Sequence, residues 1–447
     1  GKFEKVVEDC NSAINYNKRY TKAILRRAKA YETLQKWHES LRDFTAGCVL
    51  ENFANPGHLE SADAVLRRLG AEKASEAMKA RTKSVPLSTS FVESYLSSFC
   101  EDPIQNSLPK SGLIMNGSLD DSEGPSGFTL AQQALLHKSY DQVIPACSEE
   151  MERGERSQHL HDACLLRATF HIMLGEDDKA LTDMEAFFDA VKTLPDETAK
   201  KYKVNAYIKR GSLHMQQSRK QEALDDFKLA EQVDPSNADI YHHRGQLMIL
   251  LNEIEDAERD FKKSVQLRPD FAIAHVQGAY ASYRAAVASQ SYLELEKSIE
   301  RFEKLVEEFS SCAEGYALLG QAYMEQQNYA DAEKMFEKTQ SLSPTNANVY
   351  VHRGLLELQW HSNMEKAIKW MERALAVDPC CEFAYETLGT VEMQRGNIPK
   401  AVSMFEKGLE LARTEMEMFH LFTLREAAIA QRAVAETFGV TVPSMVS

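Results

Sequence analysis

A basic cluster near the start of the chain is the first group of residues whose types and spacing could do chemistry. Its members are Lys18, Arg19, Lys22, Arg26, Arg27 and Lys29. On a helix, Lys22 and Arg26 would share one face, where like charges repel by roughly 0.2–0.5 kcal/mol. A carboxylate bound between them would relieve this repulsion and accept charge-assisted hydrogen bonds of roughly 1.5–3 kcal/mol each. The spacing indicates a site for an acidic group, and the alternative is a solvated basic face paired to Glu32.

A second candidate site is a row of apolar residues that recur at one register position of successive predicted helices. With their predicted neighbours they are Ile208, Met215, Ile249, Tyr280, Tyr283, Met324, Leu355 and Leu358. Such a row would form a trough for the hydrophobic side of an amphipathic or extended peptide, and methionine adapts its shape to different partners. The alternative is that these residues only pack helices together.

No enzyme motif accompanies these two sites. The sequence has no phosphate-binding G-x-x-x-x-G-K, no H-E-x-x-H and no G-x-S-x-G. The histidine pairs at 159/161 and 242/243 lack further ligands at metal-binding spacing, so we expect solvated or hydrogen-bonded histidines. The sequence predicts a binding protein without catalytic residues, cofactor or metal.

An internal repeat of about 34 residues must position both candidate sites. The prolines that mark it are Pro235, Pro269, Pro344 and Pro379, and the interval of 75 residues in the middle equals two units plus a seven-residue insertion. Each unit carries an aromatic, a glycine, an alanine and a large apolar residue, as in Tyr241, Gly245, Ala257 and Phe261. This order is typical of tetratricopeptide repeats, helical hairpins that bury their apolar faces only by stacking. The glycines should therefore lie at tight crossings between helices.

The repeats predict an all-α superhelix, a right-handed α-solenoid, in two arrays. Residues 1–82 would be the remainder of an N-terminal repeat domain, with helical pattern over 58–69 and again over 71–81. Residues 83–127, rich in serine, proline, glycine and acidic residues, predict a partly flexible linker with one docked helix at 91–99. Residues 128–447 would form a C-terminal domain of about eight hairpins, with a capping helix over 414–438.

One arginine precedes the small residue of several repeats. The set comprises Arg27, Arg167, Arg210, Arg244 and Arg353. Because long basic side chains often bury their stems and keep their charged ends in water, we expect these guanidinium groups to be solvated.

Composition limits the possible partners. The formal net charge of -15 argues against a broad nucleic-acid surface. No run of about 18 apolar residues predicts a membrane span. The eight cysteines form no C-x-x-C pair, so reduced and buried thiols are expected. In repeat register the chain starts at the turn inside a hairpin, which suggests that an upstream segment with a membrane anchor is missing.

Several longer motifs resemble one family, the animal seventy-kilodalton preprotein receptors of the mitochondrial outer-membrane translocase. They cover residues 26–30, 91–99, 241–247, 312–317, 350–356 and 383–387. The resemblance implies an N-terminal anchor, a three-repeat clamp for the acidic tails of Hsp70 and Hsp90, a linker, and an eight-repeat domain for hydrophobic precursors such as metabolite carriers. Lys22 and Arg26 match two basic clamp positions of the third repeat. The other clamp residues, a lysine and two asparagines, have no counterpart here.

The leading hypothesis is therefore an import receptor of the mitochondrial outer membrane that faces the cytosol. Its expected partners are chaperone tails, precursor proteins and other translocase subunits, with no nucleic acid and with membrane contact only through an anchor absent from this chain. The alternative is a soluble co-chaperone scaffold that binds Hsp70 and Hsp90 tails without a mitochondrial role.

Overall fold

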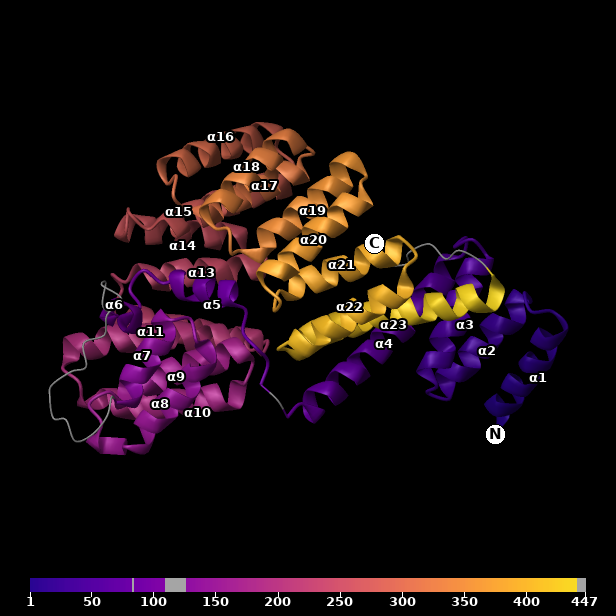
Figure 1. Cartoon of the computed structure of the whole chain (residues 1–447), viewed down its shortest axis with the longest axis horizontal. Helices are drawn as coiled ribbons and strands as arrows, with labels where there is room; N and C mark the ends of the chain where they lie inside the picture. Colours follow the sequence, from indigo (N-terminus) through magenta and orange to yellow (C-terminus); the bar gives the residue numbers. More distant parts are fainter. Residues whose placement is uncertain (83, 109–125, 440–447) are drawn as a thin grey trace. The chain divides into compact units, whose positions relative to one another are not determined.

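The computed structural model describes residues 1–82, 84–108 and 126–439, and every regular element within them is a helix (Figure 1). The first α-helices are α1 (Lys2–Tyr16), α2 (Thr21–Thr33), α3 (Trp37–Leu50), α4 (Pro56–Ala80), α5 (Thr89–Ser97), α6 (Pro103–Ser107), α7 (Gly127–Leu136), α8 (Val143–Glu152), α9 (Leu160–Leu174), α10 (Asp177–Ala190), α11 (Asp196–Gln216) and α12 (Lys220–Val233). The remaining ones are α13 (Ala238–Leu250), α14 (Ile254–Leu267), α15 (Ala272–Ala288), α16 (Tyr292–Glu308), α17 (Ala313–Glu325), α18 (Tyr329–Leu342), α19 (Ala347–His361), α20 (Met364–Val377), α21 (Glu382–Gln394), α22 (Ile398–Leu411) and α23 (Glu415–Phe438). Short 3-10 helices lie at Tyr140–Gln142, Gly154–Arg156 and Val191–Thr193. The prediction of an all-α fold is confirmed.

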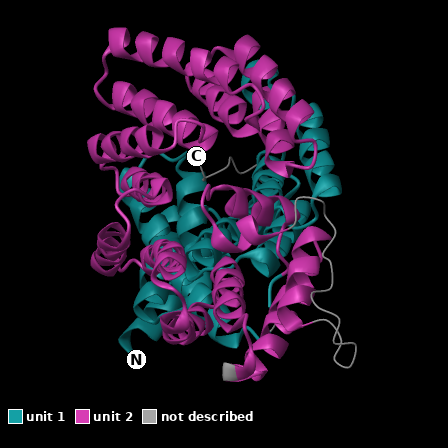
Figure 2. Ribbon diagram, turned by 90° about the vertical axis from the view of Figure 1, so that its left-hand side faces the viewer, with its two compact units in different colours: residues 1–85, 357–447 teal, residues 86–356 magenta. Residues whose placement is uncertain are grey.

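By packing, the chain forms two compact units, coloured separately in Figure 2. Unit 1 combines Gly1–Val85 with Glu357–Ser447, and unit 2 is Pro86–Leu356. Unit 1 is discontinuous because α23 packs against α3 and α4 as well as against α22. This division by packing differs from the predicted division by repeats, which assigns all of 128–447 to one domain.

The repeat glycines lie at close crossings between the two helices of a hairpin. A Cβ atom on Gly320 would lie 2.7 Å from Phe336, and on Gly245 it would lie 3.1 Å from Phe261. Gly211 is similarly close to Phe227, at 3.2 Å. These phenylalanines are almost fully buried. The predicted role of the glycines is confirmed, because a larger residue would push the second helix away from the first.

The first helix of a hairpin ends with one residue in the left-handed conformation. Asn252 has a φ of 59°, and the amide of the next residue, Glu253, donates to the carbonyl of Met248 at 2.8 Å. Gln327 and Ser218 repeat this geometry after α17 and α11. This backward hydrogen bond satisfies a free carbonyl at the helix end and turns the chain into the second helix.

The proline and the aromatic residue of successive repeats are joined by a hydrogen bond. The Tyr241 hydroxyl donates to the carbonyl of Pro235 at 2.9 Å, and Tyr350 does the same to Pro344 at 2.9 Å. A ring nitrogen of His275 makes the equivalent contact with the carbonyl of Pro269. The pairing fixes the turn between hairpins and explains why an aromatic ring follows six residues after the proline.

The repeated arginines, predicted to have solvated guanidinium groups, are instead paired with other side chains while remaining partly exposed. Each of four guanidinium groups binds the carboxylate of an aspartate sixteen residues later, on the second helix of its hairpin. The pairs are Arg27–Asp43, Arg167–Asp183, Arg210–Asp226 and Arg244–Asp260. Their aspartates are buried, so the charge must be paired. Arg353 instead binds Gln340 and Glu337 on the preceding helix, α18.

The predicted insertion lengthens two helices and forms no separate loop. α15 and α16 each contain 17 residues, whereas α13 and α14 contain 13 and 14. Gly278 on α15 lies close to the preceding helix α14, where its Cβ would be 3.1 Å from Phe261.

Two predicted helices of the first array are in fact one. α4 runs from Pro56 to Ala80 without a break at Gly70. A Cβ atom on Gly70 would lie 2.6 Å from Thr423 Oγ1, so this glycine allows α23 to approach α4 closely. α23 itself begins with a capping box between Thr414 and Glu417, in agreement with the predicted helix over 414–438.

Among the helices that the structure describes, none combines the length and the apolar composition needed to cross a membrane.

Candidate functional site

The basic positions Lys22 and Arg26 lie on α2 in unit 1, and both side chains are exposed. Within the described residues neither forms an ion pair, so the alternative pairing with Glu32 is not observed. Other members of the basic cluster are engaged: Arg27 binds Asp43, and Arg19 donates to a backbone carbonyl at 3.1 Å. Two adjacent, unpaired cations on one helix face are an arrangement that can bind a carboxylate.

In unit 2 the first helices of successive hairpins, α11, α13, α15 and α17, pack on one another along one side of the array. Corresponding second helices contact each other less closely, so the array curves with its first helices on the inner wall. A groove on this wall is where a repeat protein of this kind holds a peptide.

The predicted groove residues divide into exposed and buried sets. Partly exposed side chains belong to Met215 on α11, Ile249 on α13, Tyr280 on α15, Met324 on α17, and Leu355 and Leu358 on α19. Ile208 and Tyr283 are only 0% and 1% exposed. For these two the prediction needs correction: Ile208 packs in the hydrophobic core and the Tyr283 hydroxyl donates to Glu325, so both support the wall from behind.

A ladder of polar side chains runs between the first helices and was not predicted. A ring N–H of His243 donates to Gln246 at 3.0 Å, and the Gln246 amide donates to Gln277 at 2.8 Å. The Gln277 amide then donates to a carboxylate oxygen of Glu314 at 2.5 Å. Burial raises the pKa of Glu314, while Gln277 opposes this rise. The inner wall is therefore polar between α13 and α17, with apolar residues beside the ladder.

The segment just before α6 lies against α11 through a buried ion pair. Asp102 Oδ2 accepts hydrogen bonds from Lys209 Nζ at 2.9 Å and from Asn205 Nδ2 at 3.2 Å. Asp102 and Lys209 are only 3% and 1% exposed. Burial alone would favour the neutral acid, but Lys209 and the N–H donors around the carboxylate outweigh it and lower the pKa of Asp102.

The residues before Asp102 bind α13 in the same way. The Asp239 carboxylate accepts the backbone N–H groups of Cys100 and Glu101 at 2.8 and 2.9 Å. The Phe99 ring lies against the imidazole of His243, with ring centroids 4.1 Å apart. Burial lowers the pKa of His243 to about 3, so its ring is neutral at physiological pH. The predicted helix within the linker is present as α5, and its apolar side chains pack against the core of unit 2.

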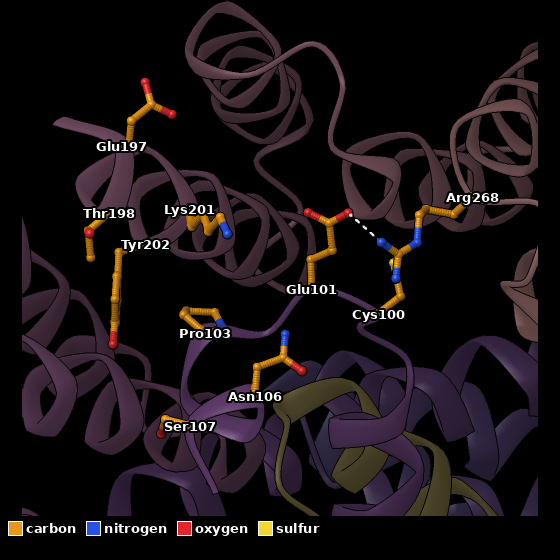
Figure 3. A pocket seen from close by; sticks show the side chains of 10 residues that line it. All are labelled: Cys100, Glu101, Pro103, Asn106, Ser107, Glu197, Thr198, Lys201, Tyr202 and Arg268. Carbon is orange, nitrogen blue, oxygen red and sulfur yellow. Dashed lines mark ion pairs between the residues drawn. The ribbon is translucent and has the colours of Figure 1, made fainter.

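A cavity of about 760 Å³ separates part of this segment from α11 (Figure 3). It is lined by Cys100, Glu101, Pro103, Asn106 and Ser107 of this segment, by Glu197, Thr198, Lys201 and Tyr202 of α11, and by Arg268 after α14. Two of these lining residues, Glu101 and Arg268, form an ion pair at 3.6 Å. The segment therefore covers the wall without filling the space beneath it.

The histidines of the two pairs contact other side chains of the protein. His242 is fully buried, and burial holds its pKa well below the usual value. His159 contacts Asp162 at 3.0 Å. No cluster of three or more metal-ligating side chains occurs among the described residues. The expectation of solvated or hydrogen-bonded histidines is wrong for His242: both of its buried ring nitrogens lack a hydrogen-bond partner among the described residues, and its ring contacts Phe261 and Phe271.

Comparison with known proteins places this arrangement in a family. Models of the tetratricopeptide repeat match residues 204–237, 238–271 and 313–346. The mitochondrial import receptor subunit TOM70 of Homo sapiens is 41% identical over 451 residues, which covers 99% of this chain and 72% of that protein. The chain belongs to the TOM70 family. The resemblance inferred from the sequence is thus confirmed.

More distant TOM70 proteins also match this chain over nearly its whole length. TOM70 of Saccharomyces cerevisiae is 22% identical over 97% of this chain. The crystal structure of yeast Tom70 superposes with a TM-score of 0.58 at 21% identity, covering 97% of this chain and 86% of that one, and so shares the fold. TOM70 proteins are import receptors of the mitochondrial outer membrane that face the cytosol, and they are not enzymes. Membership implies preproteins and other translocase subunits as partners.

Proposed function

We propose that this chain receives hydrophobic precursors of the metabolite-carrier type from chaperones and passes them to the outer-membrane translocase. The observation that carries the proposal is the 41% identity with the human import receptor across 99% of the chain. Identity over that extent favours the receptor hypothesis over a soluble co-chaperone scaffold, because a scaffold needs only the short clamp repeats.

In this proposal the inner wall of unit 2 holds the precursor. Met215, Ile249 and Met324 are partly exposed on three first helices, and each can pack against an apolar side chain of a bound segment. The partly exposed members of the polar ladder, Gln246, Gln277 and Glu314, can hydrogen-bond the backbone of an extended peptide beside them. Together they suit a segment with one apolar and one polar side.

Titration of a labelled peptide from a hydrophobic carrier into the full chain tests the groove. We expect the triple variant Met215→Ala, Ile249→Ala, Met324→Ala to bind roughly tenfold or more weakly, because apolar anchors dominate such interfaces. The matched control replaces Leu229, Leu293 and Leu342, exposed leucines on the second helices α12, α16 and α18, with alanine. Equal affinities of both triple variants and the unmodified chain would place the precursor elsewhere.

The chaperone contact is assigned to Lys22 and Arg26. Both are exposed and unpaired among the described residues, and their spacing suits the terminal carboxylates of an Hsp70 or Hsp90 tail. Because two cations form only part of a clamp, we expect weak binding by this chain, which calorimetry with an acidic tail peptide can measure.

A further inference from the structure

Two first helices use the same pair of register positions to carry polar groups toward a carboxylate. On α2, Lys22 and Arg26 lie six and two residues before Ala28, the small residue of that repeat. On α11, Asn205 and Lys209 occupy the equivalent places before Gly211. Lys22 and Arg26 are exposed, whereas Asn205 and Lys209 both donate to the Asp102 carboxylate. The α11 pair therefore already binds an acidic group of the kind that the α2 pair could accept.

The next repeat continues the pattern. Asp239 and His243 lie six and two residues before Gly245, at the same register positions on α13. Asp239 binds two consecutive backbone amides, of Cys100 and Glu101, and His243 packs against the Phe99 ring. Main-chain hydrogen bonds, one aromatic contact and one charge pair are the elements with which a groove recognises an extended peptide.

We propose that the inner wall of the repeats at 204–271 is a binding site for a short peptide with an aromatic residue followed three residues later by an aspartate. In the described structure the chain's own Phe99–Asp102 segment occupies this site. An external acidic peptide of the same pattern competes with it. Because α11 and α13 also carry Met215 and Ile249, this proposal rests on the proposed precursor groove and adds an acidic ligand to it, which is tested with a different peptide.

The geometry of the segment supports its role as a ligand. α5 and α6 contain only 9 and 5 residues and do not form a repeat hairpin. The segment contributes Asp102, which also caps α6 through the amides of Ile104 and Gln105, so its bound shape is preorganised. Phe99 and Asp102 are buried against α11 and α13, while Val92 and Ile104 on either side pack in the core of unit 2.

Binding of a fluorescent peptide that copies residues 96–107, with serine in place of Cys100, tests the site. The full chain carrying Phe99→Ala and Asp102→Ala leaves the aromatic and acidic positions of the site empty, and it should bind the peptide roughly tenfold or more tightly than the unmodified chain. Adding Lys209→Met to this variant, or replacing the peptide's aspartate by asparagine, should lower the affinity by roughly tenfold or more, because each removes a charge-assisted hydrogen bond. Adding Lys203→Met, a partly exposed lysine on the same helix, is the matched control and should change little.

Absence of peptide binding to a variant that circular dichroism shows to be folded would overturn the proposal. Equal binding by the Lys209→Met variant would also overturn it. If the double variant does not fold, the binding experiment is replaced by a hydrogen-exchange measurement on the full chain carrying Asp102→Asn. The amides of Cys100 and Glu101 should then exchange roughly tenfold faster while those of α17 and α18 do not change. Unchanged exchange of these two amides would contradict a segment held by the charge on Asp102.

Discussion

The Arg244 guanidinium binds the Asp260 carboxylate through two parallel hydrogen bonds, Nε to Oδ2 at 2.7 Å and Nη2 to Oδ1 at 2.8 Å. The pair joins α13 to α14, and its aspartate is 8% exposed. We expect Arg244→Met to destabilise the protein by about 2–4 kcal/mol, because it leaves a buried carboxylate without its partner. Urea unfolding followed by circular dichroism measures the effect.

A matched control lies on the same second helix. Arg259 pairs with Asp256 at the surface, where Arg259→Met should cost less than about 0.5 kcal/mol. The double variant Arg244→Met, Asp260→Leu should recover most of the lost stability, since no uncompensated charge remains. Similar costs for Arg244→Met and Arg259→Met would show that the pair does not hold the hairpin together.

A methyl group added at Gly320 should be poorly tolerated. Its Cβ would lie 2.7 Å from the Phe336 ring, and we expect Gly320→Ala to destabilise the protein by about 1–3 kcal/mol despite the better helix propensity of alanine. Phe336→Leu in the same chain should restore part of the loss by making room. Gly57→Ala is the control, because the nearest atom to its Cβ is 3.4 Å away. A thermal midpoint unchanged by Gly320→Ala would argue against a tight crossing.

Glu382, at the start of α21, should make unit 1 less stable as the pH rises. Burial raises its pKa to about 7, with further contributions from Glu417 and Glu386, while Arg413 and His420 oppose the rise. The folded state therefore holds this proton more tightly than the unfolded state. The resulting stabilisation is complete below about pH 4.5 and is lost as the pH approaches 7.

Replacing Glu382 with glutamine should remove this part of the pH dependence. At pH 8 we expect Glu382→Gln to be more stable than the unmodified chain by about 1–2 kcal/mol, a value reduced because the α21 N-terminus favours a carboxylate. At pH 4.5 the two should be equal. Glu365→Gln, an exposed residue in the first turn of α20, is the control. Thermal unfolding of each variant at both pH values measures these stabilities. If Glu382→Gln differed from the unmodified chain by the same amount at pH 4.5 and at pH 8, the raised pKa of Glu382 would be contradicted.

Removal of either exposed cation of α2 should weaken the binding of acidic tails without affecting folding. Lys22→Ala and Arg26→Ala should each lower the affinity for a Glu-Glu-Val-Asp peptide by roughly tenfold, the contribution of one charge-assisted hydrogen bond. Lys29→Ala, also exposed on α2, should leave the affinity unchanged. Calorimetry that finds all three variants alike would remove Lys22 and Arg26 from the site.

The helical hairpins could be predicted because the same residue types, at the same spacing, make the same contacts in each of them. Gly245 and Phe261 form one crossing, and the same spacing recurs wherever a glycine and a phenylalanine pair in this way. The Arg–Asp pairs follow an equally regular spacing of sixteen residues. The arginine positions alone do not reveal these pairs, because the partner is the aspartate that precedes the apolar residue of the second helix.

The features that the sequence did not predict depend on contacts between residues far apart in the sequence. In the sequence, Gly70 indicates a break between two helices. Only the close approach of Thr423 explains a glycine inside one continuous helix. Similarly, nothing near Asp102 in the sequence points to Lys209, its partner 107 residues later. Tyr283 has the register of a groove residue, yet its hydroxyl turns toward Glu325, and a repeat pattern cannot give that direction.

The packing of α23 on α3 and α4 has a consequence for how the protein is made. A ribosome synthesises α3 and α4 first, but the helix that covers Leu66 and Leu69 belongs to the last part of the chain. Until α23 is made, the parts of these side chains that it covers stay accessible to water and to other nascent chains, while unit 2 can already fold. Such surfaces aggregate readily, so newly made chains should depend on holding chaperones until their final helix emerges.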